Sequence, residues 1–228
     1  MSRHRVAAVG VVVPAHDEQA LLPACLAALR TALRHPALAR VEVHLVPVLD
    51  ACTDDSGAMA PGAVEVQARN VGVARAAGFA EVLRREAGRP GGQLWLATTD
   101  ADSRVPPDWL ATQLRLAHGG ADVVAGSVRV EDWSEQTQAV RHRFRASYAG
   151  GADGHRHVHG ANLGLSAAAY TEVGGVPPVA LAEDQALVDA LRLRAARLVS
   201  TARIPVVTSA RRESRTWGGF ADHLRALG

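Results

Sequence analysis

The stretch Leu94-Trp95-Leu96-Ala97-Thr98-Thr99-Asp100-Ala101-Asp102-Ser103 is the part of this sequence that best predicts its fold. The apolar first half predicts a buried strand, which ends abruptly in two carboxylates two positions apart. In an open α/β sheet, ligands bind in the crevice beyond the carboxyl ends of the strands. Two acids at such a place repel each other, and a hard divalent cation such as Mg²⁺ or Mn²⁺ stabilises both. The spacing alone is common, so the neighbouring segments have to support a metal site.

The composition is that of a globular protein with a sizeable core. The chain has 228 residues, which fits one domain, and 48% of them are hydrophobic but only 4% aromatic. A formal net charge of +2 argues against a general nucleic-acid binder, which needs a broad basic face. The two cysteines, Cys25 and Cys52, form neither a CxxC pair nor a disulfide framework.

The sequence contains no membrane-spanning or secretory signal. No stretch approaches the roughly 20 apolar residues that cross a bilayer. The basic residues 1–5 precede an apolar run, 6–13, that is too short for a signal core and has no cleavage site after it. We therefore expect a cytoplasmic protein.

Strands and helices alternate along the first 130 residues, which predicts an α/β fold with a largely parallel sheet and helices on both faces. After residue 130 the alternation changes, and a polar helix (133–148), a glycine-rich loop (150–157), a helix (183–194) and a strand (204–208) follow. We expect a single domain, with a nucleotide-binding half at about 1–104 and an acceptor half at about 105–228. In the first half the pattern predicts strands at 6–13, 41–49, 64–68 and 94–99, and helices at 17–33 and 72–85.

Polar residues follow each of the four strands predicted in the first half, at 14–18, 50–55, 69–72 and 100–102. Any one of them can be ordinary helix capping, and Asp17 and Asp54 are interpreted as caps. Because the carboxyl ends of parallel strands meet at one edge of a sheet, all four groups together predict one ligand site.

Six segments resemble, in their order and spacing, the motifs of the family 2, GT-A type glycosyltransferases. The resemblance extends from Val6 to about Phe220. It implies a GT-A fold, which is a Rossmann-like mixed sheet, mostly parallel and flanked by helices. It also implies a hexosyltransferase-like enzyme with a DXD motif that moves a sugar from a nucleotide-sugar donor to an acceptor hydroxyl, usually with inversion. The segments are Val12-Val13-Pro14-Ala15-His16-Asp17-Glu18, Asp50-Ala51-Cys52-Thr53-Asp54, Asn70-Val71-Gly72, Asp100-Ala101-Asp102, His159-Gly160-Ala161-Asn162 and Glu183-Asp184.

The resemblance also assigns roles at the donor. Asp50 matches the acid that contacts the donor base, and an acceptor-only carboxylate suits the N3–H of uracil, which favours a UDP-sugar. Asp102 is the implied ligand of Mn²⁺ or Mg²⁺, with Asp100 and His159 as further candidate ligands. The donor-binding residues implied are Pro14, His16, Glu18, Asp50, Asn70, Gly72, Arg75, Asp100, Ala101 and Asp102.

On the acceptor side, the resemblance makes Asp184 the general base, with Glu183 beside it. The segment His159, Gly160, Ala161 and Asn162 is implied to shape the acceptor site, and Arg215 and Trp217 are implied to close over the donor. The Gln-x-x-Arg-Trp pattern of processive polysaccharide synthases is absent, which argues against processive synthesis.

Two alternatives stay open from the sequence alone. A retaining enzyme of the same fold needs no base at Asp184 and could place His159 or His223 on the metal. A non-catalytic module would bind a nucleotide sugar without turnover. The alternating histidines His155, His157 and His159 are compatible with a metal site or with a solvated loop.

Overall fold

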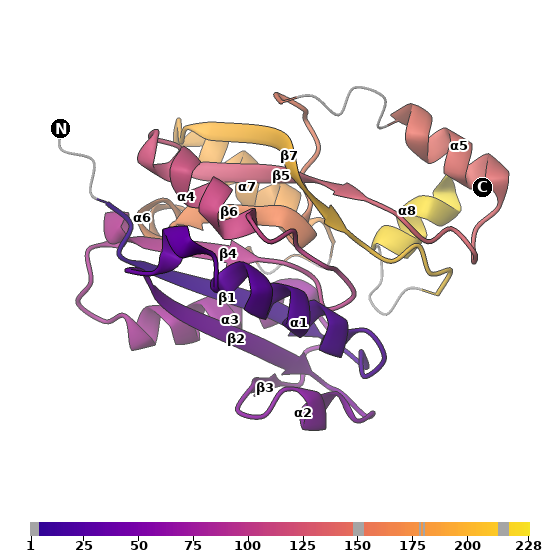
Figure 1. Ribbon diagram of the computed structural model, residues 1–228, viewed down its shortest axis with the longest axis horizontal. Coiled ribbons are helices and arrows are strands. Elements are labelled where there is room, and N and C mark those ends of the chain that lie inside the picture. The colour runs from indigo at the N-terminus through magenta and orange to yellow at the C-terminus, as the bar shows by residue number, and fades with distance from the viewer. Residues whose placement is uncertain (1–4, 148–152, 178, 180, 214–218) are drawn as a thin grey trace.

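The computed structural model of the protein describes residues 5–147, 153–177, 179, 181–213 and 219–228. The strands in these residues form one seven-stranded sheet of order β3-β2-β1-β4-β6-β5-β7 (Figure 1). Their bounds are β1 (Ala8–Ala15), β2 (Glu42–Asp50), β3 (Val64–Val66), β4 (Leu94–Thr98), β5 (Val123–Arg129), β6 (Leu163–Ser166) and β7 (Leu198–Val207). The helices are α1 (Leu22–Leu33), α2 (Ser56–Met59), α3 (Val71–Arg85), α4 (Trp109–His118), α5 (Gln138–Ser147), α6 (Ala167–Glu172), α7 (Glu183–Leu193) and α8 (Phe220–Ala226), with short 3₁₀ turns at Pro36–Leu38, Gly91–Gln93 and Gly160–Asn162.

The sheet is mixed but mostly parallel, as the sequence predicts. β1 pairs in parallel with β2 and β4, and β5 pairs in parallel with β7. The exception is β6, which runs antiparallel between β4 and β5. The sequence pattern did not predict β6, because four residues interrupted by Gly164 are too few to show a periodicity.

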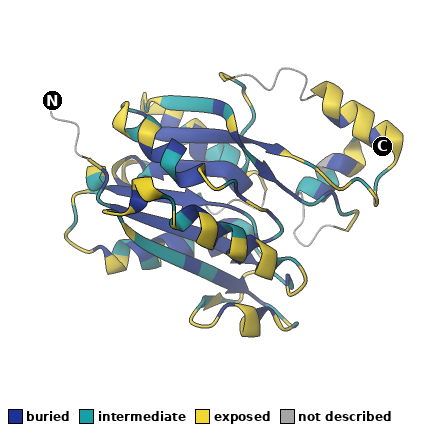
Figure 2. Cartoon of the chain, viewed as in Figure 1, coloured by how far each residue is buried: buried dark blue, intermediate teal, exposed yellow. Residues whose placement is uncertain are grey.

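The side chains of the central strand β1 point alternately to the two faces of the sheet, and the core accordingly has two layers. Val9, Val11 and Val13 of β1 face one apolar cluster, which α1 and α4 cover. Ala8 and Val12 face the other, which is covered by α3, α6 and α7. Side chains of a strand point alternately to opposite faces, so an unbroken run of small apolar residues is what a strand buried on both faces requires. Figure 2 shows the buried central strands in dark blue between helices with exposed outer faces.

Two glycines let α3 approach the sheet closely. A Cβ at Gly10 would overlap the side chain of Val82, and a Cβ at Gly78 would overlap Val12. The resulting contact between α3 and strands β1 and β2 fixes where the N-terminus of α3 emerges at the carboxyl edge of the sheet. That edge carries the site described below.

A small third cluster lies beyond the ends of β5 and β7. There α5 packs against α8 through Val140, Phe144 and Leu224, and Phe220 meets Phe144 edge to face at 5.7 Å (Figure 1). The sequence predicts α5 but not α8, which has only seven residues and begins at Phe220.

Several element boundaries differ from the sequence-based expectation, among them those of the first helix and the last strand. The first helix begins at Leu22 and not at Asp17, so Asp17 is not its N-cap. The last strand is ten residues long and not five, because β7 continues to pair with β5 on both sides of a register shift. Among the described helices, none combines the length and the apolar character that crossing a bilayer would require.

Candidate functional site

The motif segments of the sequence come together around one cavity of about 620 Å³ at the carboxyl edge of the sheet. It extends from the ends of β1, β2 and β4 to the first turn of α7 and to α8. Asn70, Gly72 and Asn162 do not line it, and Arg215 and Trp217 lie outside the described residues. The predicted site residues that line it are Pro14, His16, Glu18, Asp50, Arg75, Asp100, Ala101, Asp102, His159, Gly160, Ala161, Glu183 and Asp184.

Asp102 lies in the floor of the cavity, and its side chain is only 13% exposed. Ser103 donates a hydrogen bond to its Oδ1 over 3.2 Å, and Oδ2 lies 3.2 Å from Nη2 of Arg211. Burial raises the pKa of Asp102 to about 6, and the neighbouring carboxylates Asp100 and Glu18 add to this, while Arg211 opposes it. A buried carboxylate with negative neighbours attracts cations.

Arg211 is the cation that this acidic group attracts. Its two terminal nitrogens bind the carboxylate of Glu18 in a fork, over 2.8 Å and 2.6 Å. Glu18 is therefore paired with an arginine that is remote in the sequence. Sequence reasoning did not select Arg211, although the arginine-rich segment 211–215 gave the signal.

A second arginine separates two other acids of the site. The guanidinium of Arg75 donates to Asp100 Oδ1 over 2.5 Å and also to Glu183 Oε1, and its side chain is 6% exposed. It lies directly against Gly160, where a Cβ would overlap the guanidinium. Arg75 thus connects the end of β4 with the start of α7, which the sequence alone did not indicate.

Asp50 is largely occupied by the backbone of the loop after β3. Its Oδ1 accepts from the N–H groups of Ala68 and Arg69 over 2.7 and 2.8 Å, and Oδ2 accepts from Asn70 N–H over 2.7 Å. The carbonyl oxygen of Asp50 accepts from Nδ1 of His16 over 2.6 Å, which fixes the tautomer of that imidazole. Asp50 therefore shapes one end of the cavity as well as lining it.

Asn70 and Gly72 act behind the cavity wall. Asn70 is the N-cap of α3, because its Oδ1 accepts from the N–H of Val73 over 3.1 Å. Gly72 lies against the side chain of Glu183, whose Cγ would be 3.0 Å from an added Cβ. Both residues position α3 against α7, and the side chain of Arg75 projects from α3.

Asp184 lines the cavity at the start of α7. Its Oδ2 accepts the backbone N–H of Gly160 over 2.7 Å, and its Oδ1 accepts the N–H of Gln185 over 2.7 Å. These bonds hold the carboxylate between the helix and the turn Gly160–Asn162. His157 and His159 line the same wall, with their rings stacked 6.1 Å apart.

Asn162 is a structural residue of the fold. It is fully buried, accepts from Trp109 Nε1 over 2.8 Å, and donates to the carbonyls of Ser127 and Ile204. Both of its N–H groups are used, and its burial keeps Oδ1 away from the cavity. Its influence on the cavity is therefore limited to holding the turn that carries Gly160.

Four residues that are not glycine adopt left-handed backbone conformations around the cavity. Asp17 (φ 52°), Ala51 (φ 51°) and Arg69 (φ 48°) follow β1, β2 and β3, and Ala182 (φ 54°) precedes α7. Such conformations cost of order 1–2 kcal/mol each and persist only where the surrounding contacts impose them. The backbone is thus strained at the edge of the sheet where the cavity lies.

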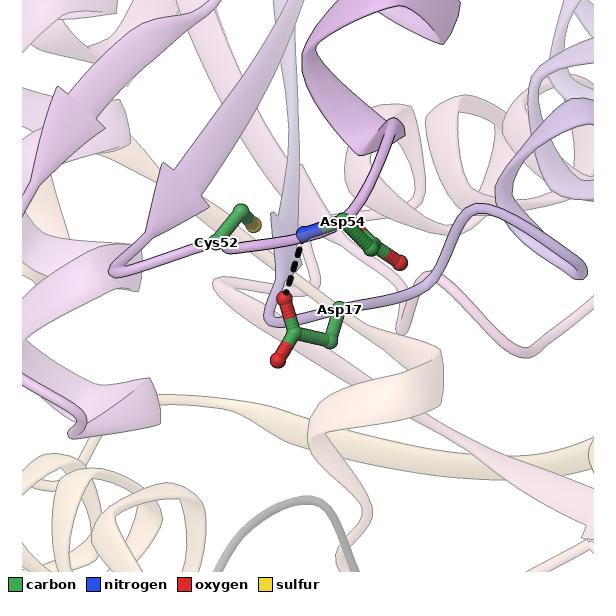
Figure 3. A group of neighbouring side chains, drawn as sticks. All are labelled: Asp17, Cys52 and Asp54. Carbon is green, nitrogen blue, oxygen red and sulfur yellow. Dashed lines mark hydrogen bonds between the residues drawn. The ribbon is translucent and has the colours of Figure 1, made fainter.

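A separate acid and thiol group joins the loops after β1 and β2 (Figure 3). Asp17 accepts from the N–H groups of Thr53 and Asp54 over 2.6 and 3.2 Å, and Asp54 accepts from Gln19 N–H over 2.9 Å. Cys52 donates to the carbonyl of Ala15 over 3.4 Å. The carboxylates of this group fix one loop to the other, which corrects the interpretation of Asp17 as a helix cap.

The donor atoms in the cavity suit a hard divalent cation. Asp100 and Asp102 offer carboxylate oxygens at the end of β4, beside open volume large enough for a phosphorylated ligand. Asp102 is the better candidate, because among the described residues its only ion-pair partner is Arg211, at 3.2 Å. Asp100 is held by the buried Arg75.

Known structures with a similar fold are glycosyltransferases. They include S. aureus TarS in complex with UDP-GlcNAc (14% identity, TM-score 0.65) and a Pyrobaculum calidifontis mannosyltransferase in complex with GDP-Man and Mn²⁺ (20%, 0.65). A third is glucosyl-3-phosphoglycerate synthase from Mycobacterium tuberculosis in complex with Mg²⁺ and UDP (16%, 0.54). In the order named, the alignments include 96%, 91% and 96% of this chain. This chain covers 65%, 58% and 74% of the lengths of the three proteins. At these identities the likeness establishes the GT-A fold.

The sequence itself carries a family relationship. No curated protein matches the chain significantly. Residues 10–171, which are more than half of the chain and include the ends of β1, β2 and β4 and the turn Gly160–Asn162, match the family described as Glycosyl transferase family 2. With the GT-A fold and the cavity at the strand ends, this match means that the chain belongs to glycosyl transferase family 2.

Proposed function

We propose that this protein transfers a sugar from a nucleotide-sugar donor, preferably a UDP-sugar, to an acceptor hydroxyl with inversion at the anomeric carbon. One observation supports this most strongly. The acids at the end of β4, the loop fixed by Asp50 and the carboxylate of Asp184 all line a single cavity. Family membership favours glycosyl transfer over other reactions at such a site.

The donor would lie along the ends of β1, β2 and β4. His16, with its tautomer set by the Asp50 carbonyl, and the loop after β3 form the nucleoside end. Asp102, with Asp100 beside it, would hold Mn²⁺ or Mg²⁺ next to the diphosphate. A bound divalent cation neutralises the negative charge that develops on the departing nucleoside diphosphate.

Asp184 would act as the general base. Its hydrogen bonds to Gly160 and Gln185 fix the carboxylate at the cavity wall, and each oxygen retains a further lone pair. In the proposed step, the acceptor oxygen bonds to the anomeric carbon while its proton passes to Asp184. The bond from that carbon to the diphosphate oxygen breaks, and the nucleoside diphosphate leaves with the electron pair. Such a base contributes about 10²- to 10⁴-fold to the rate.

Ligand-induced thermal stabilisation tests the donor site. UDP, GDP, dTDP and their sugars would be added to the protein with and without Mn²⁺ or Mg²⁺. A ligand at 100 times its dissociation constant adds about 2.7 kcal/mol to the stability. We expect a metal-dependent shift that is largest for the uridine nucleotides.

Two variants make this test specific. Asp102→Asn should abolish the metal-dependent part of the shift and also the slow hydrolysis of the donor. Asp108→Asn changes an exposed aspartate at the start of α4, outside the cavity, and should behave as the wild type. Stabilisation by nucleotide without any turnover, whatever the acceptor offered, would instead indicate a binding module.

A further inference from the structure

Arg211 bridges two acids that belong to different parts of the sheet edge. Its fork binds Glu18, from the loop after β1, and its Nη2 also lies 3.2 Å from Oδ2 of Asp102, after β4. The side chains of Glu18, Asp102 and Arg211 are only 6%, 13% and 20% exposed. Two buried carboxylates without a cation are costly, so the guanidinium stabilises this pair of acids.

The two contacts of Arg211 differ in strength. The pair with Glu18 is bidentate, with distances of 2.8 and 2.6 Å, which is the strong geometry for a guanidinium and a carboxylate. The contact with Asp102 is single and longer, at 3.2 Å, and it uses the nitrogen that already donates to Glu18. Arg211 can therefore release Asp102 while it remains bound to Glu18.

Arg75 has no comparable freedom. It donates to both Asp100 and Glu183, it is 6% exposed, and it lies against the backbone at Gly160. Withdrawing it would leave two acids unpaired and open the contact between β4 and α7. Of the two acids at the end of β4, Asp102 is the one whose counter-ion can be exchanged.

We propose that Arg211 competes with the divalent cation for Asp102, and that it has to withdraw from this carboxylate before the cation binds. The inference rests on the proposed function, because it takes Asp102 as the metal ligand. Arg211 is then a positioning residue: it stays paired with Asp102 until a cation displaces it, and so weakens the binding of metal alone. Once displaced, the guanidinium remains in the cavity on Glu18, where phosphate oxygens are its natural acceptors.

Binding of Mn²⁺ in the absence of any nucleotide tests the competition. Mn²⁺ is titrated into the wild type, Arg211→Gln and Arg69→Gln. The electron paramagnetic resonance signal of free Mn²⁺ measures how much of the ion remains unbound. Arg69 also lines the cavity, but its side chain forms no ion pair with another described residue. Its variant therefore removes the same charge without the contact to Asp102.

We expect Arg211→Gln to bind Mn²⁺ at least about tenfold more tightly than the wild type, because a unit charge a few ångströms from the ligand is removed. Arg69→Gln should change the affinity by less than about twofold, as is usual for an exposed charge. Equal or weaker Mn²⁺ binding by Arg211→Gln, or an equal gain in both variants, would overturn the proposal.

Two further proteins keep the result interpretable. If Arg211→Gln does not fold, Arg211→Lys retains the charge but loses the fork, and we expect an affinity above that of the wild type. An unchanged affinity in that variant counts against the proposal. Asp102→Asn reports on the proposed function itself: if it binds Mn²⁺ as the wild type does, or if none of the proteins binds Mn²⁺, the assigned metal site is wrong. If Asp102→Asn loses binding but Arg211→Gln binds Mn²⁺ no more tightly than the wild type, the metal site stands and the competition alone fails.

Discussion

The backbone N–H of Gly160 donates to Oδ2 of Asp184 over 2.7 Å, and this bond joins the turn before β6 to the first turn of α7. It restricts the carboxylate to one orientation at the cavity wall. Acids are common in the first turn of a helix because of the helix dipole alone. The fixed orientation that this bond adds is what makes Asp184 a candidate for catalysis.

Asp184→Asn should lower kcat for sugar transfer by about 10²- to 10⁴-fold and leave donor affinity unchanged. The asparagine oxygen can still accept from Gly160, whereas the proton acceptor and the bond from the Gln185 N–H are lost. Steady-state kinetics and donor titration measure the two effects separately. Asp189→Asn, on the exposed side of the same helix, is the control, and an equal loss of donor binding and transfer would contradict the assignment.

Gly160→Ala should disrupt the site through Arg75. The added methyl group would overlap the buried guanidinium, and overpacking of this kind costs about 1–3 kcal/mol. We expect a lower free energy of unfolding in urea and a large loss of transfer activity. Gly57→Ala is the control: its nearest neighbour would be Leu49 Cδ1 at 3.8 Å, so stability should change by no more than about 0.5 kcal/mol. Equal stability of both variants would show that Arg75 is free to move.

Ala182→Gly should stabilise the protein by roughly 0.5–1 kcal/mol, because glycine adopts the left-handed conformation without a steric penalty. The same substitution four residues later, Ala186→Gly, lies inside α7 and should destabilise it by roughly 0.5–1 kcal/mol. Chemical denaturation of both variants measures whether each substitution raises or lowers the free energy of unfolding. A loss of stability in both would mean that residue 182 is not held at positive φ in solution.

The carboxylate of Asp17 makes the stability of the protein depend on pH in the acid range. The backbone N–H of Thr53 is the largest cause that holds the pKa of Asp17 below its ordinary value of 3.8. A carboxylate with a lowered pKa in the folded state contributes stability above its unfolded pKa and loses it as the pH falls through the folded value. Asp17→Asn should therefore reduce stability at neutral pH and flatten its decline below about pH 4.

Urea unfolding between pH 2.5 and 7 measures how the free energy of unfolding of the wild type and of Asp17→Asn changes with pH. Thr53→Val serves as the comparison, since it removes the side-chain hydroxyl but keeps the backbone N–H that is the main cause of the shift. Its pH dependence should remain close to that of the wild type. If Asp17→Asn has the same slope as the wild type, the hydrogen bonds of Asp17 do not contribute to stability.

Most of the fold and the position of the site follow from local sequence patterns. The apolar runs predict the strands, Asn70 predicts the start of α3, and the acids after residues 98 and 182 predict where ligand groups occur. Short elements were missed, because β6 and α8 are too brief to show a period. No local pattern reveals that the chain itself takes up three acceptor positions of Asp50, and its contact with a donor base stays a prediction.

The sequence by itself determined most of the strands and helices, the edge of the sheet where the cavity lies, and the acids that meet there. These depend on periodicity and on polar residues at strand ends, which are properties of neighbouring positions. Only the tertiary structure decided which charges are paired: Arg211 with Glu18 and Asp102, and Arg75 with Asp100 and Glu183. Burial creates the need for these counter-ions, and the sheet topology brings residues as far apart as 18 and 211 within hydrogen-bonding distance.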